Sequence, residues 1–372
     1  MKITDLTVTI FAWDNIPARS YARHTGTVAA GSSEVGLVTI STDQGVQGHS
    51  FFGTNSRGAY MDATTLIRAL KPLVVGQNPW NREEIFQKMW ARNLHTTARC
   101  IGAIDIALWD LCGKMANLPI YKMLGAYRSS IPAYSSSEVL PSKEAYVEEA
   151  LRIKEAGFHG YKIHPPTNYE EDIVICRDVR KAVGDDYRLM LDPSLAYNYI
   201  EALQVGKALE DLNYYWYEDP MDCDDLTNYV KLRQMVRVPI LATERSYGGF
   251  QAMAPWIMYQ ATDFLRGDVA IKGGITPLVK IANLAEAFHM TLEVHHGGNS
   301  TNNFANLHVI LSIPNSGQYE FLLPATTQNY GVIEDIKIGK DGHVRLPNPD
   351  APGLGAEIDF GLIEQKKLEV LK

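Results

Sequence analysis

The chain has 372 residues, of which 46% are hydrophobic and 21% are charged, and its formal net charge is -8 at pH 7. This composition is that of a globular protein long enough for two domains, or for one large barrel with a smaller companion. The acidic balance argues against nucleic acid as a partner, because phosphate backbones are bound by clustered Lys and Arg. Small acidic substrates remain possible, since a local pocket can be positive inside an acidic protein.

The N-terminus and the cysteines favour a cytoplasmic protein. Residues 1–6 lack the basic-then-apolar pattern of a signal peptide, and no apolar run is long enough to span a bilayer. The four cysteines are far apart in the sequence and form no CxxC pair: Cys100, Cys112, Cys176 and Cys223. We therefore expect reduced thiols, and neither a disulfide framework nor a zinc site.

The N-terminal third is predicted to be an α+β unit over residues 1–125. Alternating or β-branched runs predict strands at 3–10, 34–41 and 46–49, and Asp43-Gln44-Gly45 is a plausible hairpin turn before the third. Apolar residues then recur at helical spacing over 60–90, where Pro72 and Pro79 interrupt the pattern, and over 101–111.

Residues 126–340 alternate short apolar runs with helical stretches. Eight runs are strand candidates: 131–136, 160–164, 188–192, 214–218, 239–244, 264–268, 291–295 and 318–321. Helices are predicted between them, for example over 171–183, 199–212 and 276–288. Eight strands separated by helices indicate a (β/α) barrel or a doubly wound sheet. The tail, 341–372, is rich in Pro and Gly and is expected to be a loop-like segment that packs back on the N-terminal unit.

Most of these strand candidates end in an ionisable residue. In chain order they are Lys162 and His164, Asp192, Glu218, Glu244, Asp268, His295 and Glu320, and the gaps counted from Lys162 are 24 to 30 residues. One βα unit of a barrel has about this length, so each side chain is expected at the carboxyl end of a successive strand. These ends share one rim, which is where barrel enzymes carry out their chemistry.

Three adjacent strands would bring the carboxylates of Asp192, Glu218 and Glu244 together. Three carboxylates at close range repel one another unless a cation joins them. Oxygen-only ligation that leaves room for water and substrate is typical of Mg²⁺. The sequence therefore predicts a magnesium site on the rim.

Candidate bases flank that metal on both sides. Strand alternation places Lys162 and His164 on one face, and it turns His295 to the lumen while His296 begins the next loop. A carboxylate chelated by a metal has a more acidic α-proton, because the enediolate spreads its charge onto the cation. A base on either face can remove that proton, and Asp268 would orient and charge-stabilise the His295 imidazole.

The set resembles the enolase superfamily, and within it the mandelate racemase-type subgroup, over nearly the whole chain. Four stretches in the expected order carry the resemblance: Ala103-Ile104-Asp105-Ile106-Ala107-Leu108-Trp109-Asp110, Trp216-Tyr217-Glu218-Asp219-Pro220, Asp268-Val269 running into Gly273-Gly274-Ile275-Thr276, and Pro352-Gly353-Leu354-Gly355. The resemblance implies a (β/α)₇β modified TIM barrel under an α+β capping domain. It also implies metal ligation by Asp192, Glu218 and Glu244, a His295–Asp268 dyad and a substrate-facing acid, Glu320.

Two positions refine the resemblance. A histidine on the seventh strand separates the sequence from the muconate-cycloisomerase type, which has a lysine base at the end of the sixth. The subgroup commonly has Lys-x-Lys on the second strand, whereas this chain has Lys162-Ile163-His164. An imidazole, with an ordinary pKa of about 6.5, needs less tuning than a lysine to act as a base near neutral pH and can return the proton as an acid.

Taken singly, these residues have plainer explanations. Asp192 and Glu218 lie close before prolines and could shape turns or cap helices, and a lone histidine is more often a satisfied core residue. The common spacing favours the catalytic interpretation. Weaker substrate contacts are expected from Tyr21 and His24 in a cap loop, from Ser136 at the first strand end and from His296.

The leading hypothesis is dehydration of a sugar acid, an aldonate or aldarate, to a 2-keto-3-deoxy acid. The polar cap loops favour a polyhydroxylated substrate, and either His164 or His295 could be the base or the acid. The alternatives are a racemase or epimerase of a 2-hydroxy acid and a catalytically silent member. We expect a small carboxylate as the partner, no nucleic acid or membrane, and a homo-oligomer by resemblance.

Overall fold

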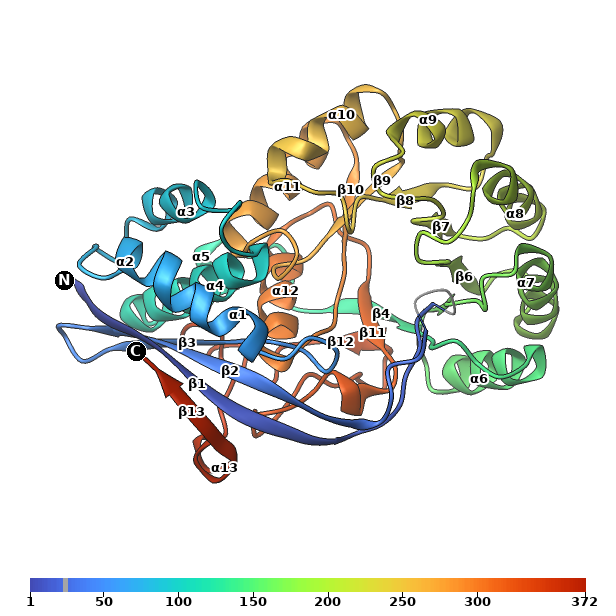
Figure 1. Cartoon of the computed structure of the whole chain (residues 1–372). Coiled ribbons are helices and arrows are strands. Elements are labelled where there is room, and N and C mark those ends of the chain that lie inside the picture. Colours follow the sequence, from blue (N-terminus) through green and yellow to red (C-terminus); the bar gives the residue numbers. More distant parts are fainter. Residues whose placement is uncertain (23–25) are drawn as a thin grey trace.

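The computed structural model describes residues 1–22 and 26–372 and contains two sheets (Figure 1). The smaller sheet is antiparallel, in the order β13-β1-β2-β3. Its strands are β1 (Ile3–Ile16), β2 (Gly31–Thr42), β3 (Gln47–Phe52) and β13 (Lys367–Leu371). The expected turn at residues 43–45 joins β2 to β3, with Gly45 at a φ of 77°.

Helices cover one face of this sheet and form a cap. They are α1 (Tyr60–Thr65), a π-helical turn (Leu66–Leu70), α2 (Lys71–Val74), α3 (Arg82–Trp90), α4 (Ala98–Ala116) and α5 (Ile120–Met123). The helical pattern predicted over 60–90 is thus divided into short pieces. Pro72 lies in α2, which follows the π-helical turn directly within an unbroken helical run over residues 60–74.

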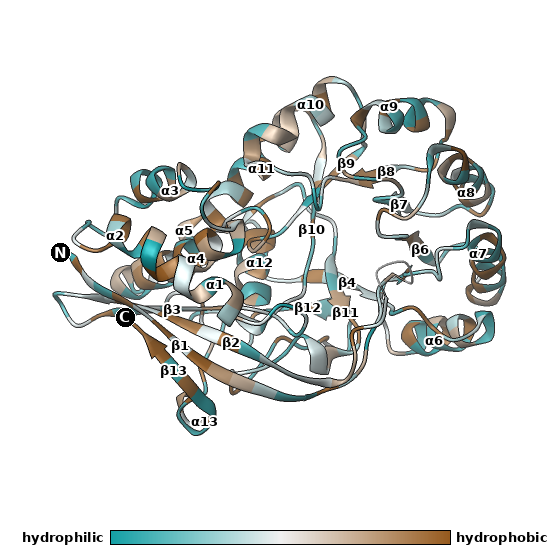
Figure 2. Ribbon diagram, in the orientation of Figure 1, coloured by the Kyte–Doolittle hydropathy of each residue, from teal (hydrophilic) through white to brown (hydrophobic). Residues whose placement is uncertain are grey.

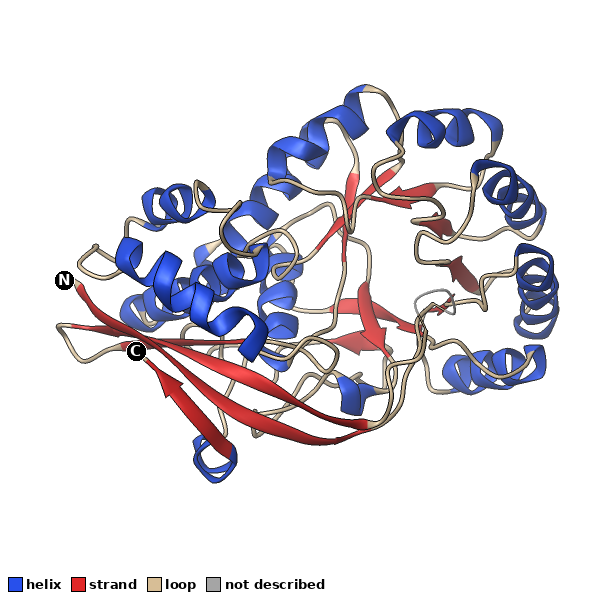
Figure 3. Ribbon diagram, in the orientation of Figure 1, coloured by secondary structure: helices blue, strands red, loops and turns tan. Residues whose placement is uncertain are grey.

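The larger sheet is a nearly closed barrel of eight parallel strands, so the predicted fold class is confirmed (Figure 3). The order around it is β10-β9-β8-β7-β6-β5-β4-β11. The strands are β4 (Ile131–Ser136), β5 (Gly160–Ile163), β6 (Arg188–Leu191), β7 (Trp216–Glu218), β8 (Ile240–Ala242), β9 (Phe264–Gly267), β10 (Thr291–Val294) and β11 (Tyr319–Leu322). The short β12 (His343–Val344) pairs antiparallel with β4.

Helices surround the barrel and bury its outer face. They are α6 (Lys143–Glu155), α7 (Tyr169–Val183), α8 (Tyr199–Asp211), α9 (Leu226–Met235), α10 (Met253–Met258), α11 (Ile275–Ala287) and α12 (Ser300–Ser312). Brown apolar stretches of these helices lie toward the strands in Figure 2, and the buried residues between the two layers form one continuous core. Inside the barrel, a separate apolar cluster of Tyr134, Met190, Trp216 and Leu241 fills the lumen. Among the described residues, no helix combines the length and hydropathy needed to cross a membrane.

Helix α4 joins the cap to the barrel through two buried carboxylates. Asp105 accepts hydrogen bonds from the Thr276 backbone N–H at 2.9 Å and from its hydroxyl at 2.6 Å. Gly274, at a φ of 125°, makes this approach possible, since a Cβ there would lie 2.2 Å from Asp105 Oδ2. Asp110 accepts from the N–H of Leu354 at 2.9 Å and from that of His49 at 2.8 Å. The sequence stretches 103–110, 273–276 and 352–355, which carried the family resemblance, therefore meet at this joint.

The tail contains more structure than the expected loop. Helix α13 (Phe360–Lys366) leads into β13, which pairs with β1 in the register Val8 to Leu371 and Ile10 to Glu369. The proline- and glycine-rich composition describes only residues 347–355 well. A strand of five residues that pairs with a segment far away in sequence has too weak a local signal to be predicted alone.

Candidate active site

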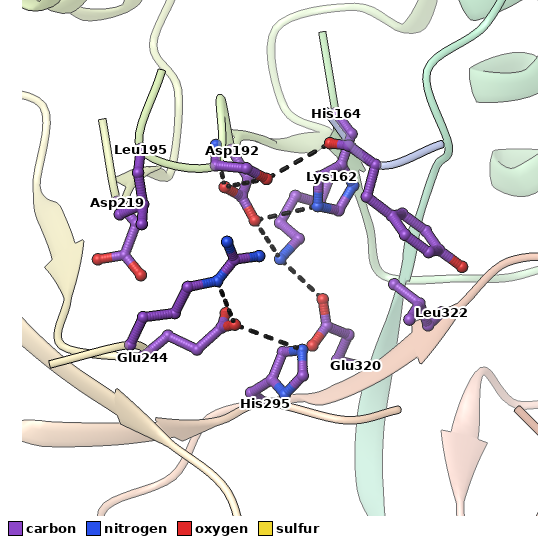
Figure 4. Close-up of a pocket in the computed structure, with 12 residues that line it drawn as sticks. Lys162, His164, Asp192, Leu195, Asp219, Glu244, His295, Glu320 and Leu322 are labelled. Carbon is purple, nitrogen blue, oxygen red and sulfur yellow. Dashed lines mark hydrogen bonds and ion pairs between the residues drawn. The ribbon is translucent and has the colours of Figure 1, made fainter. Parts of the chain in front are cut away.

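A polar cavity opens at the carboxyl ends of the barrel strands (Figure 4). It is lined by Tyr21, Lys162, His164, Asp192, Ser194, Leu195, Asp219, Glu244, Arg245, His295, Glu320 and Leu322. Six of the predicted catalytic or metal-binding residues are among them, and the other two, Glu218 and Asp268, lie buried against its wall. The predicted rim residues are thus brought together at one site.

The carboxylates of Asp192, Glu218 and Glu244 converge at this cavity. One oxygen of each lies within 4.8 Å of the others, and all three side chains are buried. Glu218 is the last residue of β7, while Asp192 follows β6 directly and its Oδ1 accepts the Ser194 N–H at 2.8 Å. Close buried carboxylates with oxygen donors alone suit a hard divalent cation, so these residues fit Mg²⁺.

The backbone that presents Glu244 is strained and braced. Thr243, just after β8, has a φ of 90°, an uncommon conformation for a β-branched residue. Its N–H donates to Asp219 at 3.2 Å, and its hydroxyl donates to the Arg266 carbonyl at 2.9 Å. The buried Lys272 ammonium donates to the carbonyls of Thr243 at 2.7 Å and Ser246 at 3.0 Å. These contacts hold the residue before Glu244 in a conformation that turns the following carboxylate toward the other two.

His164 presents its Nε2 atom to the acidic cluster. Its Nδ1 lies 2.7 Å from the Ser137 carbonyl, which can only accept, so Nδ1 carries the proton of this hydrogen bond. Nε2 lies 3.1 Å from Asp192 Oδ2. The ring is therefore held in one orientation, with Nε2 directed at the Asp192 carboxylate in the acidic cluster.

His295 approaches from the opposite side of the cluster (Figure 4). Its Nδ1 lies 2.5 Å from Asp268 Oδ2, and its Nε2 lies 3.9 Å from Glu244 Oε1. Burial alone would lower the pKa of His295, but the Glu244 and Asp268 carboxylates raise it to about 9. The Asp268 carboxylate also accepts the Ile271 N–H at 2.6 Å, so it is fixed in place. The Asp268 and Glu244 carboxylates thus favour the imidazolium form of His295.

Lys162 is bound by three carboxylates rather than free to act as a base. Its ammonium lies 2.7 Å from Glu320 Oε1, 2.9 Å from Glu218 Oε2 and 3.2 Å from Asp192 Oδ2. Burial alone would lower the pKa of Lys162, but the surrounding carboxylates hold it well above its usual range. Lys162 therefore supplies a fixed positive charge at the floor of the cavity.

The weaker substrate contacts are placed differently. Tyr21 lines the cavity and packs edge-on against His164, but its hydroxyl donates to the Leu323 carbonyl at 2.6 Å. Ser136 and His296 are not among the cavity-lining residues. The Ser136 hydroxyl lies 3.4 Å from His164 Nδ1, and the His296 ring packs on Tyr319 with centroids 3.9 Å apart. His24 lies outside the described residues.

Sequence reasoning missed Arg266, Asp219 and Arg245. Arg266 is wholly buried on β9, and its guanidinium contacts Glu218 at 2.5 Å and Glu320 at 2.6 Å. The signal was available, because Arg266 is two residues before Asp268 and strand alternation puts both on the lumen face. Asp219 and Arg245 follow predicted metal ligands directly and line the cavity, but no periodic pattern distinguishes them from ordinary loop residues.

Two family models match the chain: "Mandelate racemase / muconate lactonizing enzyme, N-terminal domain" over residues 7–125 and "Enolase C-terminal domain-like" over residues 145–361. Arabinonate dehydratase of Saccharolobus solfataricus is 30% identical over 355 residues, covering 90% of this chain and 91% of that protein. N-succinyl-L-Arg/Lys racemase of Bacillus cereus is 28% identical, covering 88% of this chain and 89% of that protein.

Among solved structures, D-glucarate dehydratase from Agrobacterium tumefaciens, complexed with magnesium, superposes with a TM-score of 0.88 at 32% identity. The match covers 99% of this chain and 100% of that one. Both family models, and relatives matched over nearly their full length, agree with the fold. The chain belongs to the mandelate racemase / muconate lactonizing enzyme family of the enolase superfamily.

Proposed function

We propose that this enzyme is a Mg²⁺-dependent sugar acid dehydratase that removes the proton next to the substrate carboxylate. The observation that carries the proposal is the pair of imidazoles on opposite sides of the acidic cluster, with different partners at Nδ1. His164 donates to a neutral carbonyl, whereas His295 donates to a carboxylate. We assign the proton-accepting role to His164 and the proton-donating role to His295, whose imidazolium form is favoured by Asp268.

Asp192, Glu218 and Glu244 would hold the metal, which supplies positive charge to the substrate carboxylate and so makes its α-proton more acidic. In the proposed reaction, His164 Nε2 takes the C2 proton, and the electron pair forms the C2–C3 double bond as the C3–O bond breaks. His295 Nε2 gives its proton to the departing hydroxyl, which leaves as water. The resulting enol becomes a 2-keto-3-deoxy acid when a proton is added at C3.

The relatives support this class of substrate without identifying one member of it. Arabinonate dehydratase is a sugar acid dehydratase by name, and L-talarate/galactarate dehydratase of Salmonella typhimurium is 32% identical over 276 residues. The cavity itself is lined largely by charged and hydroxyl side chains, which suits a polyhydroxylated acid better than an aromatic one.

Racemisation of a 2-hydroxy acid is the second candidate. The same two imidazoles could serve opposite faces of one carbon, and one of the relatives is named a racemase. A racemase would need His295 unprotonated in one direction of turnover, and the Asp268 contact works against that.

Incubation of the Mg²⁺-loaded enzyme with a library of aldonates and aldarates in D₂O tests the proposal. We expect a keto acid detectable with a carbonyl reagent, and loss of its formation in His164→Ala and His295→Asn. His159→Asn is a matched control, because His159 precedes β5 at the opposite end of the barrel. An epimer carrying deuterium at C2, without keto acid, would contradict dehydration and leave the base assignments standing.

A further inference from the structure

Four charged side chains form a closed ring at the floor of the cavity. Lys162 contacts Glu218 at 2.9 Å, Glu218 contacts Arg266 at 2.5 Å, Arg266 contacts Glu320 at 2.6 Å, and Glu320 returns to Lys162 at 2.7 Å. Cations and anions alternate around the ring, and every side chain in it is at most 1% exposed. Each carboxylate therefore has one oxygen on each cation.

Two neutral side chains hold the ring from outside. Trp216 donates its indole N–H to Glu218 at 3.1 Å, and Arg266 donates to the Tyr134 hydroxyl at 3.2 Å. Both aromatic residues belong to the apolar cluster that fills the lumen. An apolar surrounding strengthens the ion pairs, and it makes the loss of one member costly because the remaining charge would be buried without a partner.

The ring also determines the charge that a metal would meet. When ionised, Asp192, Glu218, Glu244 and Glu320 supply four negative charges, and Lys162 and Arg266 supply two positive ones, which leaves two negative charges. Asp219 and Arg245, which also line the cavity, add one charge of each sign when ionised and leave this sum unchanged. The His295–Asp268 pair contributes no net charge when the imidazole is protonated. One divalent cation would therefore neutralise the cluster, whereas a cluster without Arg266 would carry three negative charges.

We propose that Arg266 is a positioning residue that holds Glu218 and Glu320 in this ring and matches the charge of the site to one divalent ion. It does not line the cavity and acts through the two glutamates. The inference rests on the proposed function for its kinetic readout only. Metal binding is measured without any substrate, so the two can fail separately.

The test compares the affinities of the metal-free enzyme for Mg²⁺ and La³⁺ by calorimetry. Misplacement of Glu218 would weaken the binding of both ions. The ratio of the two affinities therefore reports the net charge of the site. In Arg266→Met we expect the preference to shift toward La³⁺ by at least about tenfold, and kcat to fall about 10- to 100-fold. Arg266→Lys keeps the charge but loses the fork that reaches both glutamates. Arg266→Lys should retain the wild-type ion ratio and lose part of kcat. If Arg266→Met does not fold, Arg266→Lys should still fold and can be measured in its place.

Arg180→Met is the matched control. Arg180 is also buried, but its guanidinium donates to main-chain carbonyls such as Leu212 at 2.8 Å and Gly184 at 2.7 Å, away from the cavity. Its loss should lower stability without changing the ion ratio or kcat. The double variant Arg266→Met/Glu320→Gln restores two net negative charges and should return the ion ratio toward wild type while kcat stays low. The inference would be overturned if folded Arg266→Met kept the wild-type ion ratio and kcat. It would also be overturned if the double variant had the same ion ratio as Arg266→Met.

Discussion

The barrel lumen buries glutamates at two levels, in two different electrostatic states. At the rim, Glu320 contacts both Lys162 and Arg266, and these cations hold its pKa well below the usual range although burial works against ionisation. On β10, two residues before His295, Glu293 accepts the N–H groups of Gly317 at 3.0 Å and Gln318 at 3.3 Å, its hydrogen-bond donors among the described residues. Burial raises the pKa of Glu293 to about 7. The cations beside Glu320 thus favour its ionised form, whereas burial favours the protonated form of Glu293.

The largest expected effect is a difference between Glu218→Gln and Glu293→Gln in how much Mg²⁺ stabilises the protein. Glu218→Gln removes a proposed ligand and one link of the ion-pair ring, so we expect activity to fall more than about 10³-fold and the Mg²⁺-induced rise in thermal midpoint to disappear. Glu293→Gln should keep the wild-type activity and the Mg²⁺-induced rise in thermal midpoint. Thermal melts with and without Mg²⁺ and a chelator measure this contrast. Equal Mg²⁺ responses in the two variants would show that Glu218 is not a ligand.

The next largest effect is expected at the His295–Asp268 pair. Asp268→Asn keeps the shape but removes the carboxylate that favours the imidazolium, so kcat should fall about 10²- to 10⁴-fold. Because the pKa of His295, about 9 in the wild type, would drop, the alkaline limb of the pH profile of kcat should move to lower pH. Asp178→Asn on α7, which removes a surface ion pair to Lys143, is the control. A profile that did not move would mean that His295 is not the acid.

The smallest effect concerns the stability of the lower level. Between the unfolded pKa of about 4.3 and the folded pKa of about 7, the folded protein holds a proton on Glu293 that the unfolded chain releases, so stability falls as pH rises through this window. Glu293→Gln should remove this slope and stabilise the protein at pH 8 by roughly 1–3 kcal/mol. Chemical unfolding of the wild type and of Glu293→Gln at pH 5 and pH 8, in the presence of a chelator, measures this difference in the free energy of unfolding. Glu286→Gln, an exposed change on α11, should alter neither value.

Much of this site could be predicted because its residues repeat with the barrel unit. The ends of β5 to β11 were located from apolar runs, and the rim residues followed from their spacing. Arg266 precedes Asp268 by two residues and so shares its strand face, but the sequence alone does not show that two buried glutamates surround it. Ser137 holds His164 at two points that no sequence pattern indicates: its carbonyl accepts from His164 Nδ1 at 2.7 Å, and its hydroxyl accepts the His164 backbone N–H at 3.0 Å.

Other features depend on contacts between distant segments. Gly267 carries no local signal, yet a Cβ there would lie 2.9 Å from the Lys272 side chain, which braces the loop before Glu244. Ser136 and His296 do not line the cavity: the Ser136 hydroxyl lies against the His164 ring, and the His296 ring packs on Tyr319. Strand alternation alone does not determine these orientations. Periodicity predicts which face of a strand a residue occupies, and packing decides which atom of that residue is available.

The pairing of β13 with β1 also has a consequence for the order of folding. β13 follows the entire barrel in the sequence but forms the outer strand of the cap sheet, beside residues 8–11. During synthesis, β1 emerges early and its edge stays unpaired until the barrel has been made. An exposed edge strand can pair with another chain. The edge of β1 is therefore open to misassociation in the nascent chain, and the strand that covers it is made only after the barrel.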